Sequence, residues 1–282
     1  MSAEGSHGEE ATFSPTAEFE HAVEPLSFAG VKLQFHLGPI DMSINRVVVY
    51  LWLAAIITGV ICIGIARIAA IIPSRKQVAF EALYEMVRDN LVGAVMHGKV
   101  AVKWFPYLLS LFLFILISNL IGLVPLFVSV DHNNIPQFSA YAATSNINVT
   151  VALALLTFGL THVSGVRANG AIGYFKGWIP GTAPVVLKPV LFLIHAVSEF
   201  FRLVSLGVRL FANMLAGHIM ILVFYGLIFM LPSVLMIIVL SPLIEVGVVA
   251  ISLFEIFVSV IQAYIFAILS AVYIGGAIHQ EH

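Results

Sequence analysis

Long apolar runs separated by short polar segments fill most of the chain after residue 45. Three of these runs, 47–72, 105–130 and 147–164, have the length of a single membrane span. A helix of about 20 apolar residues crosses a hydrocarbon core of about 30 Å. The pattern therefore predicts three transmembrane helices, the first ending at Pro73 and the second closing near Pro125.

The segment 77–102 has a different pattern, because charged and apolar residues alternate there at helical spacing. The charged positions are Glu81, Glu85, Arg88, Asp89 and Lys99, and the apolar ones are Phe80, Leu83, Tyr84, Val87, Leu91 and Val95. Such a segment is typical of an amphipathic helix that lies on the membrane surface and does not cross it.

The last ninety residues hold two runs that are too long for ordinary spans, 190–230 and 234–278. As helices they would be roughly 60 Å long, about twice the thickness of the hydrocarbon core. A turn inside the first run would need a polar loop, and its middle, 205–218, contains none. We therefore expect a hairpin of two long helices that are strongly tilted in the membrane.

Composition supports a membrane protein, since 60% of residues are hydrophobic and only 10% are charged. Soluble domains carry about 25% charged residues. The formal net charge of -2 excludes a nucleic-acid binder driven by counterion release. The single cysteine, Cys62, excludes a disulfide framework and a cysteine-rich metal site.

These patterns together predict an all-α polytopic membrane protein with a polar N-terminal arm over 1–45 and one membrane domain over 46–282. The arm is acidic and has no basic residue before Lys32, so it does not have the pattern of a signal peptide. A solvated tail without a role and a segment that binds a partner or lies on the membrane surface are both compatible with it.

Basic residues flanking the spans predict the orientation. If the three single spans alternate, Lys32 and Arg46 lie on one side of the membrane, and the other loop-flanking basic residues lie on the opposite side: Arg67, Arg75, Lys76, Arg88, Lys99, Lys103, Arg167, Lys176 and Lys188. Basic loops are retained on the cytoplasmic side. We therefore expect the N-terminus outside, and the surface helix, the 167–188 loop and the C-terminus in the cytoplasm.

The two long runs hold most of the intramembrane ionisable side chains: His195, Glu199, Arg202, Arg209, His218, Glu245 and Glu255. Each costs roughly 2.5–3.5 kcal/mol on insertion, so each needs a polar partner or a water-filled cavity. The spacing puts many polar residues on common helix faces. The polar face of the first helix consists of His195, Ser198, Glu199, Arg202, Ser205, Arg209 and Asn213. The second helix has a polar stripe made of Glu245, Ser252 and Ser259 together with Glu255 and Gln262.

Several of these residues also have a structural interpretation. Arg202 could snorkel to the surface or pair with Glu199 or Ser198. Glu245 lies near the loop between the long runs, which favours an interfacial position, and His195 with Glu199 fits an internal pair at i, i+4.

Arg209 is different, because it lies in the middle of a long apolar run with no carboxylate within four residues. An always-charged guanidinium at that depth predicts an anionic partner from outside the local sequence.

Several motifs resemble subunit a of the rotary F-type ATP synthase. They are the segment 205–218 around Arg209 and Asn213, the segment 255–266 from Glu255 through Gln262, Val272-Tyr273, 119–125 and 147–150. The resemblance covers about residues 45–282. It implies a stator with two long, nearly horizontal helices against a rotating ring of c subunits, together with peripheral-stalk b-type subunits, in an energy-coupling membrane such as the bacterial plasma membrane.

The resemblance also implies roles for single residues. Arg209 matches the family's essential arginine, and the outer half-channel residues fall on Asn119, His218, Glu255 and Gln262, with Ser205, Asn213 and Ser259 in support. In this family the ring carboxylate is protonated in lipid and ionised beside water. The arginine causes the arriving ring carboxylate to release its proton, and it blocks a direct proton leak between the two half-channels. Proton transport must then turn the ring.

The chain departs from the family at three positions. His195 stands where many members have Glu, Leu203 replaces a common Pro, and Asn146 replaces a common Asp. For the cytoplasmic half-channel we expect His195, Ser198, Glu199 and Arg202 to form the polar face, with His195 and Glu199 together replacing the single glutamate.

Two other classes of function remain as alternatives, a stand-alone channel or secondary transporter and an intramembrane enzyme. The sequence shows no inverted repeat, no nucleotide-binding glycine motif and no hydrolase or metalloprotease motif. We therefore expect a non-catalytic, proton-translocating subunit without metal or cofactor, and protons are preferred over sodium as the coupling ion.

Overall fold

The structure of the protein is a computed structural model. It describes residues 27–28, 31–32, 36–37, 40–41, 45–67, 75–123, 127–130, 136–138, 142–179, 184–229 and 233–279. Most of the acidic arm predicted over 1–45 lies outside the described residues.

Helices dominate the described part of the chain. They are α2 (Arg46–Arg67), α3 (Arg75–Glu85), the π-helix η1 (Met86–Val92), α4 (Gly98–Leu123), the short η2 (Ala143–Ser145), α5 (Ile147–Asn169), α6 (Ala171–Lys176), η3 (Val185–Leu187), α7 (Lys188–Phe229) and α8 (Val234–Ile278). Within the described ranges, five helical segments are long and apolar enough to cross a membrane. The predicted all-α polytopic membrane class is confirmed.

Six very short strands form three antiparallel pairs outside the helical body. They are β1 (Ser27–Phe28) with β2 (Val31–Lys32), β3 (His36–Leu37) with β4 (Ile40–Asp41), and β5 (Phe127–Val130) with β6 (Pro136–Phe138). Pieces of two to four residues do not form a sheet core.

The structure divides the segment 77–102, for which the sequence predicts one surface helix. α3 passes into η1, a turn follows, and 98–102 belong to the start of α4. Gly98 has a φ of 61°, a left-handed conformation that glycine adopts without steric cost, so the chain can change direction there.

The amphipathic character of this segment is present in the structure. Val87 and Leu91 are fully buried, whereas Arg88 and Asp89 are exposed. Arg88 Nε donates a hydrogen bond of 2.8 Å to Asp89 Oδ1, which lowers the pKa of that carboxyl.

Two predicted span ends also differ from the structure. The second helix ends at Leu123 and not at residue 130, since 127–130 form β5, and the sequence has Pro125, which disfavours helix at the residue before it. The third continues past residue 164 to Asn169, where Gly170 follows with a φ of 73°. A residue with positive φ is a common helix terminator.

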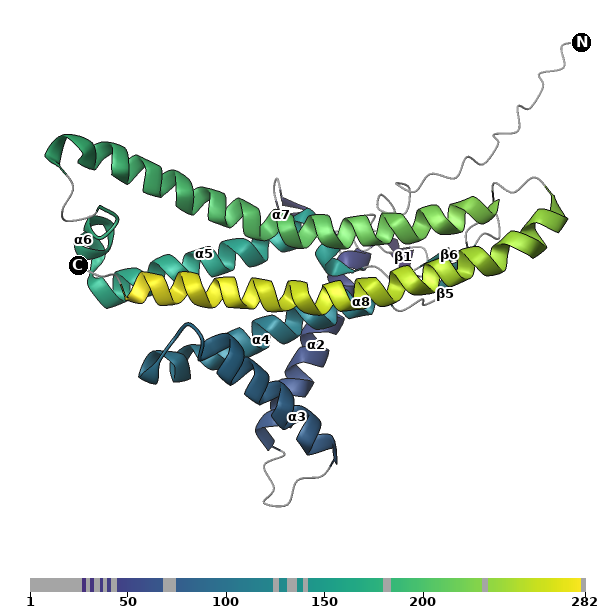
Figure 1. The fold of residues 1–282 in the computed structure, drawn as a ribbon, viewed down its shortest axis with the longest axis horizontal. Coiled ribbons are helices and arrows are strands. Elements are labelled where there is room, and N and C mark those ends of the chain that lie inside the picture. Colours follow the sequence, from purple (N-terminus) through teal and green to yellow (C-terminus); the bar gives the residue numbers. More distant parts are fainter. Residues whose placement is uncertain are drawn as a thin grey trace, which may run out of the picture.

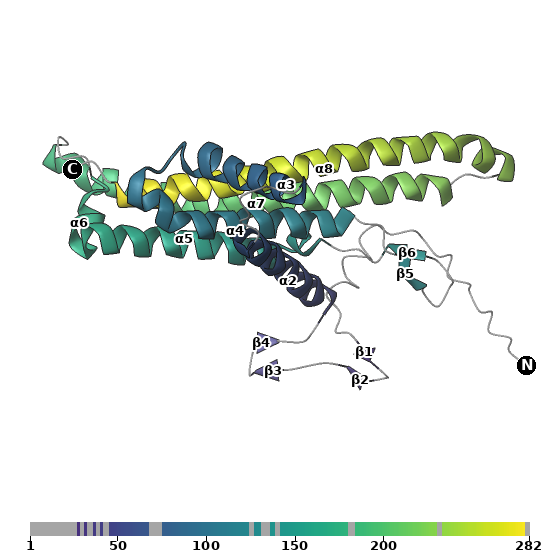
Figure 2. The ribbon, with the colours of Figure 1, turned by 90° about the horizontal axis from the view of Figure 1, so that it is seen from below.

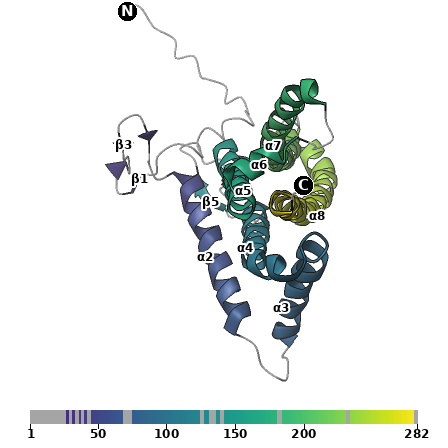
Figure 3. The ribbon, with the colours of Figure 1, turned by 90° about the vertical axis from the view of Figure 1, so that its left-hand side faces the viewer.

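The two long runs form continuous helices, as predicted. Figure 1 shows α7 and α8 side by side along the length of the molecule, with α4 and α5 beside them. Seen from below, α4, α5, α7 and α8 lie nearly parallel while α2 crosses them at an angle (Figure 2). The end view places α2 and α3 on the side away from α7 (Figure 3).

The core lies where α4 meets α8, with α5 and α7 adding to it. Ala263, Ala267 and Ala271 of α8 are fully buried, and they share the core with large α4 side chains such as Leu108 and Phe112. Small residues on one helix allow the other helix to approach closely, which is how helices gain packing energy in lipid. This packing fixes how α7 and α8 are placed relative to the polar groups of α4.

Candidate functional site

Arg209 lies on the exposed side of α7. Leu206, Leu210 and Met214 form the buried side of the same stretch, and Gly207 packs against the α5 backbone near Thr150. The Arg209 side chain is exposed, and it makes no hydrogen bond or ion pair with any residue that the structure describes. Its charge is therefore available to a partner outside the described chain.

The surface around Arg209 is made of small side chains. Ser205, Ala212 and Ala216 are exposed at helical spacing on either side of it. Larger apolar side chains, Phe200, Phe201 and Val208, are exposed on the same helix, as are Phe254 and Phe257 on α8. Another helix could approach Arg209 closely across such a surface.

A first polar cluster lies on the C-terminal side of Arg209, where α4, α7 and α8 meet. His218 Nδ1 is 2.9 Å from the Met214 carbonyl oxygen, and its Nε2 is 3.2 Å from the Gly122 carbonyl oxygen of α4. Carbonyl oxygens only accept, so both contacts become hydrogen bonds only when both ring nitrogens carry protons. The Glu255 carboxylate is 3.5 Å from Nδ1 and can balance the charge of that ring.

Several buried polar atoms of this cluster have no hydrogen-bond partner among the described residues. They belong to Ser118, Asn119, Asn213, Glu255 and Ser259. Both oxygens of the Glu255 carboxylate are included, although this side chain is only 4% exposed. A buried carboxylate without a hydrogen-bond donor is unfavourable unless water or a proton reaches it.

Asn119 and Gln262 belong to the same region of the fold. Asn119 is fully buried, and its Oδ1 accepts a hydrogen bond of 2.6 Å from Thr144, which precedes α5. Glu255, Ser259 and Gln262 are all buried, and their spacing places them on one face of α8.

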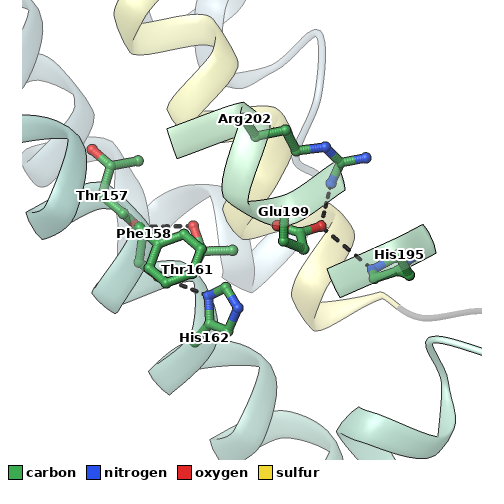
Figure 4. Close-up of polar contacts among 7 residues, drawn as sticks. All are labelled: Thr157, Phe158, Thr161, His162, His195, Glu199 and Arg202. Carbon is green, nitrogen blue, oxygen red and sulfur yellow. Dashed lines mark hydrogen bonds and ion pairs between the residues drawn. The ribbon is translucent and has the colours of Figure 1, made fainter. Parts of the chain in front are cut away.

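A second polar cluster lies on the N-terminal side of Arg209 (Figure 4). Glu199 is only 8% exposed, and its Oε1 accepts from Arg202 Nη1 at 2.5 Å. His195 Nε2 is 3.4 Å from the same oxygen. The predicted i, i+3 contact between Glu199 and Arg202 is therefore present, and the pair with His195 is present as well.

An open cavity of about 530 Å³ borders this second cluster. Its polar lining residues are Ser198, Arg202, Ser205 and Tyr273, of which Tyr273 comes from α8. The Arg202 guanidinium lies over the Tyr273 ring at 5.4 Å. The cavity therefore extends from the ion pair of α7 to Ser205, one helical turn before Arg209.

The ring of Trp178 packs against the ring of His195. The two ring centroids are 4.7 Å apart at 34°, and Trp178 also stacks on Phe192 at 5.4 Å. Tyr174 and His162 contact the same indole edge to face. The segment after α6 thus restricts the movement of His195.

The sequence did not single out Trp178, Thr144 or His162. Their contacts join segments far apart in the chain, and none has the regular spacing that marks a polar helix face. Conversely, the predicted polar stripe on α8 is buried only in part, since Glu245 is exposed while Glu255 and Ser259 are buried. Among the described residues, no group of three or more His, Cys, Asp or Glu side chains is arranged to hold a metal ion.

Comparison with known proteins identifies the family of the chain. The family model described as ATP synthase A chain matches residues 48–275. The chain belongs to the ATP synthase A chain family. ATP synthase subunit a of Rubrobacter xylanophilus is 40% identical over 253 residues, covering 88% of this chain and 90% of that protein.

Two further relatives are also ATP synthase subunit a proteins. ATP synthase subunit a of Nitrobacter winogradskyi is 34% identical over 261 residues, covering 92% of this chain and 96% of that protein. The protein of that name from Rhodopseudomonas palustris strain HaA2 is 34% identical over 248 residues, covering 88% of this chain and 93% of that protein. The family match and the five long apolar helices make this chain an integral membrane protein.

Proposed function

We propose that the chain is the stator subunit of the ATP synthase membrane sector, which conducts protons to and from a ring of c subunits. Residues 46–282 act as one membrane domain, with the N-terminus outside and the C-terminus in the cytoplasm. Peripheral-stalk b-type subunits and the remainder of the synthase complete the assembly in an energy-coupling membrane, such as the bacterial plasma membrane.

The position of Arg209 supports this proposal most directly. The guanidinium is exposed and unpaired within the described chain, between two separate polar clusters on the same helix. Glu199 lies about 15 Å before it and His218 about 13 Å after it, at roughly 1.5 Å per residue. Two half-channels that meet only at an arginine cannot pass a proton straight through the membrane.

The first cluster would form the outer half-channel. His218 and Glu255 can exchange a proton at their 3.5 Å contact, and Asn119 and Gln262 supply further polar groups near α4 and α8. The Glu255 oxygens accept no hydrogen bond from the described residues, which suits a path that delivers protons by water. Ser259 and Asn213 extend the polar lining toward Arg209.

The second cluster would form the cytoplasmic half-channel. The cavity beside Ser198 and Arg202 provides an aqueous exit, and Glu199 with His195 can pass the proton to the cytoplasm. Ser205 lines the cavity next to Arg209.

The ring would meet α7 and α8 at their exposed apolar faces. A ring carboxylate that arrives opposite Arg209 is ionised by the guanidinium and gives its proton to the second cluster. The ionised carboxylate is costly in lipid, so the ring moves on only after that carboxylate takes a new proton from the first cluster. Each proton contributes about 2.3 kcal/mol per 100 mV of membrane potential.

The deciding experiment removes the arginine. Arg209→Ala in the full complex, reconstituted in vesicles, should abolish proton-driven ATP synthesis while assembly is retained. Leaving one charge unpaired costs about 3–5 kcal/mol, which corresponds to roughly 10²–10⁴-fold in rate. Arg209→Lys should also fail, since an ammonium group does not replace the planar guanidinium.

Arg88→Ala is the matched control, because Arg88 is an exposed arginine that forms an ion pair with its neighbour Asp89. Synthesis at the normal rate in the Arg209→Ala vesicles would refute the proposal. A stand-alone channel or transporter is the alternative, and it would purify without a small hairpin subunit that carries a mid-membrane carboxylate.

A further inference from the structure

A cavity of about 240 Å³ lies at the ends of three long helices, and no residue of the two polar clusters lines it. It is lined by residues from the first turns of α4, the last turns of α5 and the last residue of α8, Ile278. Each of these helices is long enough to cross the membrane, so the cavity lies near the level of the headgroups.

Two exposed cations line this cavity, Lys103 of α4 and Arg167 of α5. Neither has an ion-pair partner among the described residues, and the described lining contains no carboxylate. Lys103 only approaches the Trp104 ring, with its Nζ at 5.9 Å from the centroid. Two uncompensated cations at one opening attract an anion.

The remaining lining is largely apolar. Val100, Leu160 and Val163 form the walls, and Ser164 donates its only hydroxyl proton to the Leu160 carbonyl oxygen at 2.5 Å. The Trp104 indole N–H is buried and has no acceptor in the part of the chain that the structure describes. A free inorganic anion would gain nothing from the apolar walls, whereas an amphipathic anion would use both parts.

We propose that this cavity binds the headgroup of one anionic phospholipid, with the phosphate between Lys103 and Arg167 and the upper part of an acyl chain along Leu160 and Val163. The Arg167 guanidinium can bind two phosphate oxygens at once, and Lys103 acts as a point charge. Pockets that enclose whole drug-sized ligands measure roughly 300–1,000 Å³, so this smaller cavity holds only part of a lipid.

The site depends on the integral membrane fold and not on the proposed proton path. A bound lipid would join α4, α5 and α8 at one end of the bundle, where Asn169 Nδ2 already donates to the Ala277 carbonyl oxygen at 3.0 Å. Anionic lipids are attracted to basic pockets between transmembrane helices at the cytoplasmic surface.

The test uses the full chain in its native assembly, placed in nanodiscs with a photoreactive phosphatidylglycerol or a photoreactive phosphatidylcholine. Peptide mapping should show labelling of 98–104 or 160–168 by the anionic probe, at least about tenfold above the zwitterionic probe. Lys103→Gln with Arg167→Gln should remove this excess. The charge-retaining pair Lys103→Arg with Arg167→Lys should keep it.

Lys99→Gln with Lys176→Gln is the matched control, because both lysines are exposed and neither lines the cavity. That variant should label like the parent. Four results would each overturn the proposal. The two probes label equally, or the double Gln variant keeps the excess labelling. Alternatively, inorganic phosphate displaces the anionic probe, or residue 163 cross-links to another subunit.

Discussion

His218 of α7 and Glu255 of α8 face each other across the helix hairpin, with Nδ1 and Oε1 3.5 Å apart. The second ring nitrogen of His218 points to the Gly122 carbonyl oxygen of α4, so one imidazole contacts three helices. Both side chains are far more buried than the exposed Arg209. A change in the protonation of either side chain therefore changes the electrostatic interaction between α7 and α8.

The first prediction concerns the carboxylates of α8. Glu255→Gln should slow proton translocation far more than Glu245→Gln, because Glu255 is buried against His218 and Glu245 is exposed. Groups that transfer protons contribute about 10²–10⁴-fold to rates, so we expect at least about a tenfold difference. A proton-pumping assay on reconstituted complexes measures it, and equal effects of the two variants would contradict the assignment.

The second prediction concerns Gly217, which packs against the Glu255 carboxylate. A Cβ added at Gly217 would collide with the end of that side chain. Gly217→Ala should therefore move the carboxylate away from His218 and reduce proton pumping, while the complex still assembles, because a flexible side chain can give way.

Gly159→Ala is the control for Gly217→Ala, since a Cβ there meets no atom within 4 Å. The two variants should differ in pumping rate and agree in the amount of assembled complex. The same pumping rate in both would show that the position of the Glu255 carboxylate does not limit transport.

The third prediction concerns the second cluster. The double variant His195→Ala with Glu199→Gln should slow passive proton conduction through the membrane sector after removal of its catalytic head, with assembly intact. The reason is that these side chains provide the titratable groups beside the 530 Å³ cavity. His162→Ala is a useful comparison, because this histidine contacts Trp178, whereas the ion pairs of Glu199 in the described chain are with His195 and Arg202. Unchanged conduction in the double variant would place the exit elsewhere.

The fourth prediction concerns Trp178 as a positioning residue. Trp178→Ala should free the His195 ring and change the pH profile of passive conduction, since the orientation of His195 toward Glu199 is no longer fixed. Trp178→Phe should restore most of the parent profile, because an aromatic ring can still stack on Phe192 and His195. Identical profiles for the Ala and Phe variants would reduce Trp178 to a packing role.

Some element boundaries required the tertiary structure. The sequence predicts one surface helix over 77–102, yet the chain turns after η1 and starts α4 at Gly98. The apolar and charged positions keep helical spacing on both sides of that turn, so periodicity alone does not reveal it. The φ of 61° at Gly98 is a local backbone state that many glycines could adopt.

The amino-acid sequence by itself determined the all-α membrane class and the two long helices. It also determined that Arg209 lies in a long apolar run with no carboxylate within four residues. Hydrophobic periodicity and the cost of a charge in lipid are local properties, so they can be read along one chain. Only the tertiary structure decided that Glu255 faces His218, that Thr144 donates to Asn119 and that Trp178 covers His195. Those contacts depend on the register and crossing of separate helices, which the packing of α4 against α8 fixes and which no spacing within a single helix encodes.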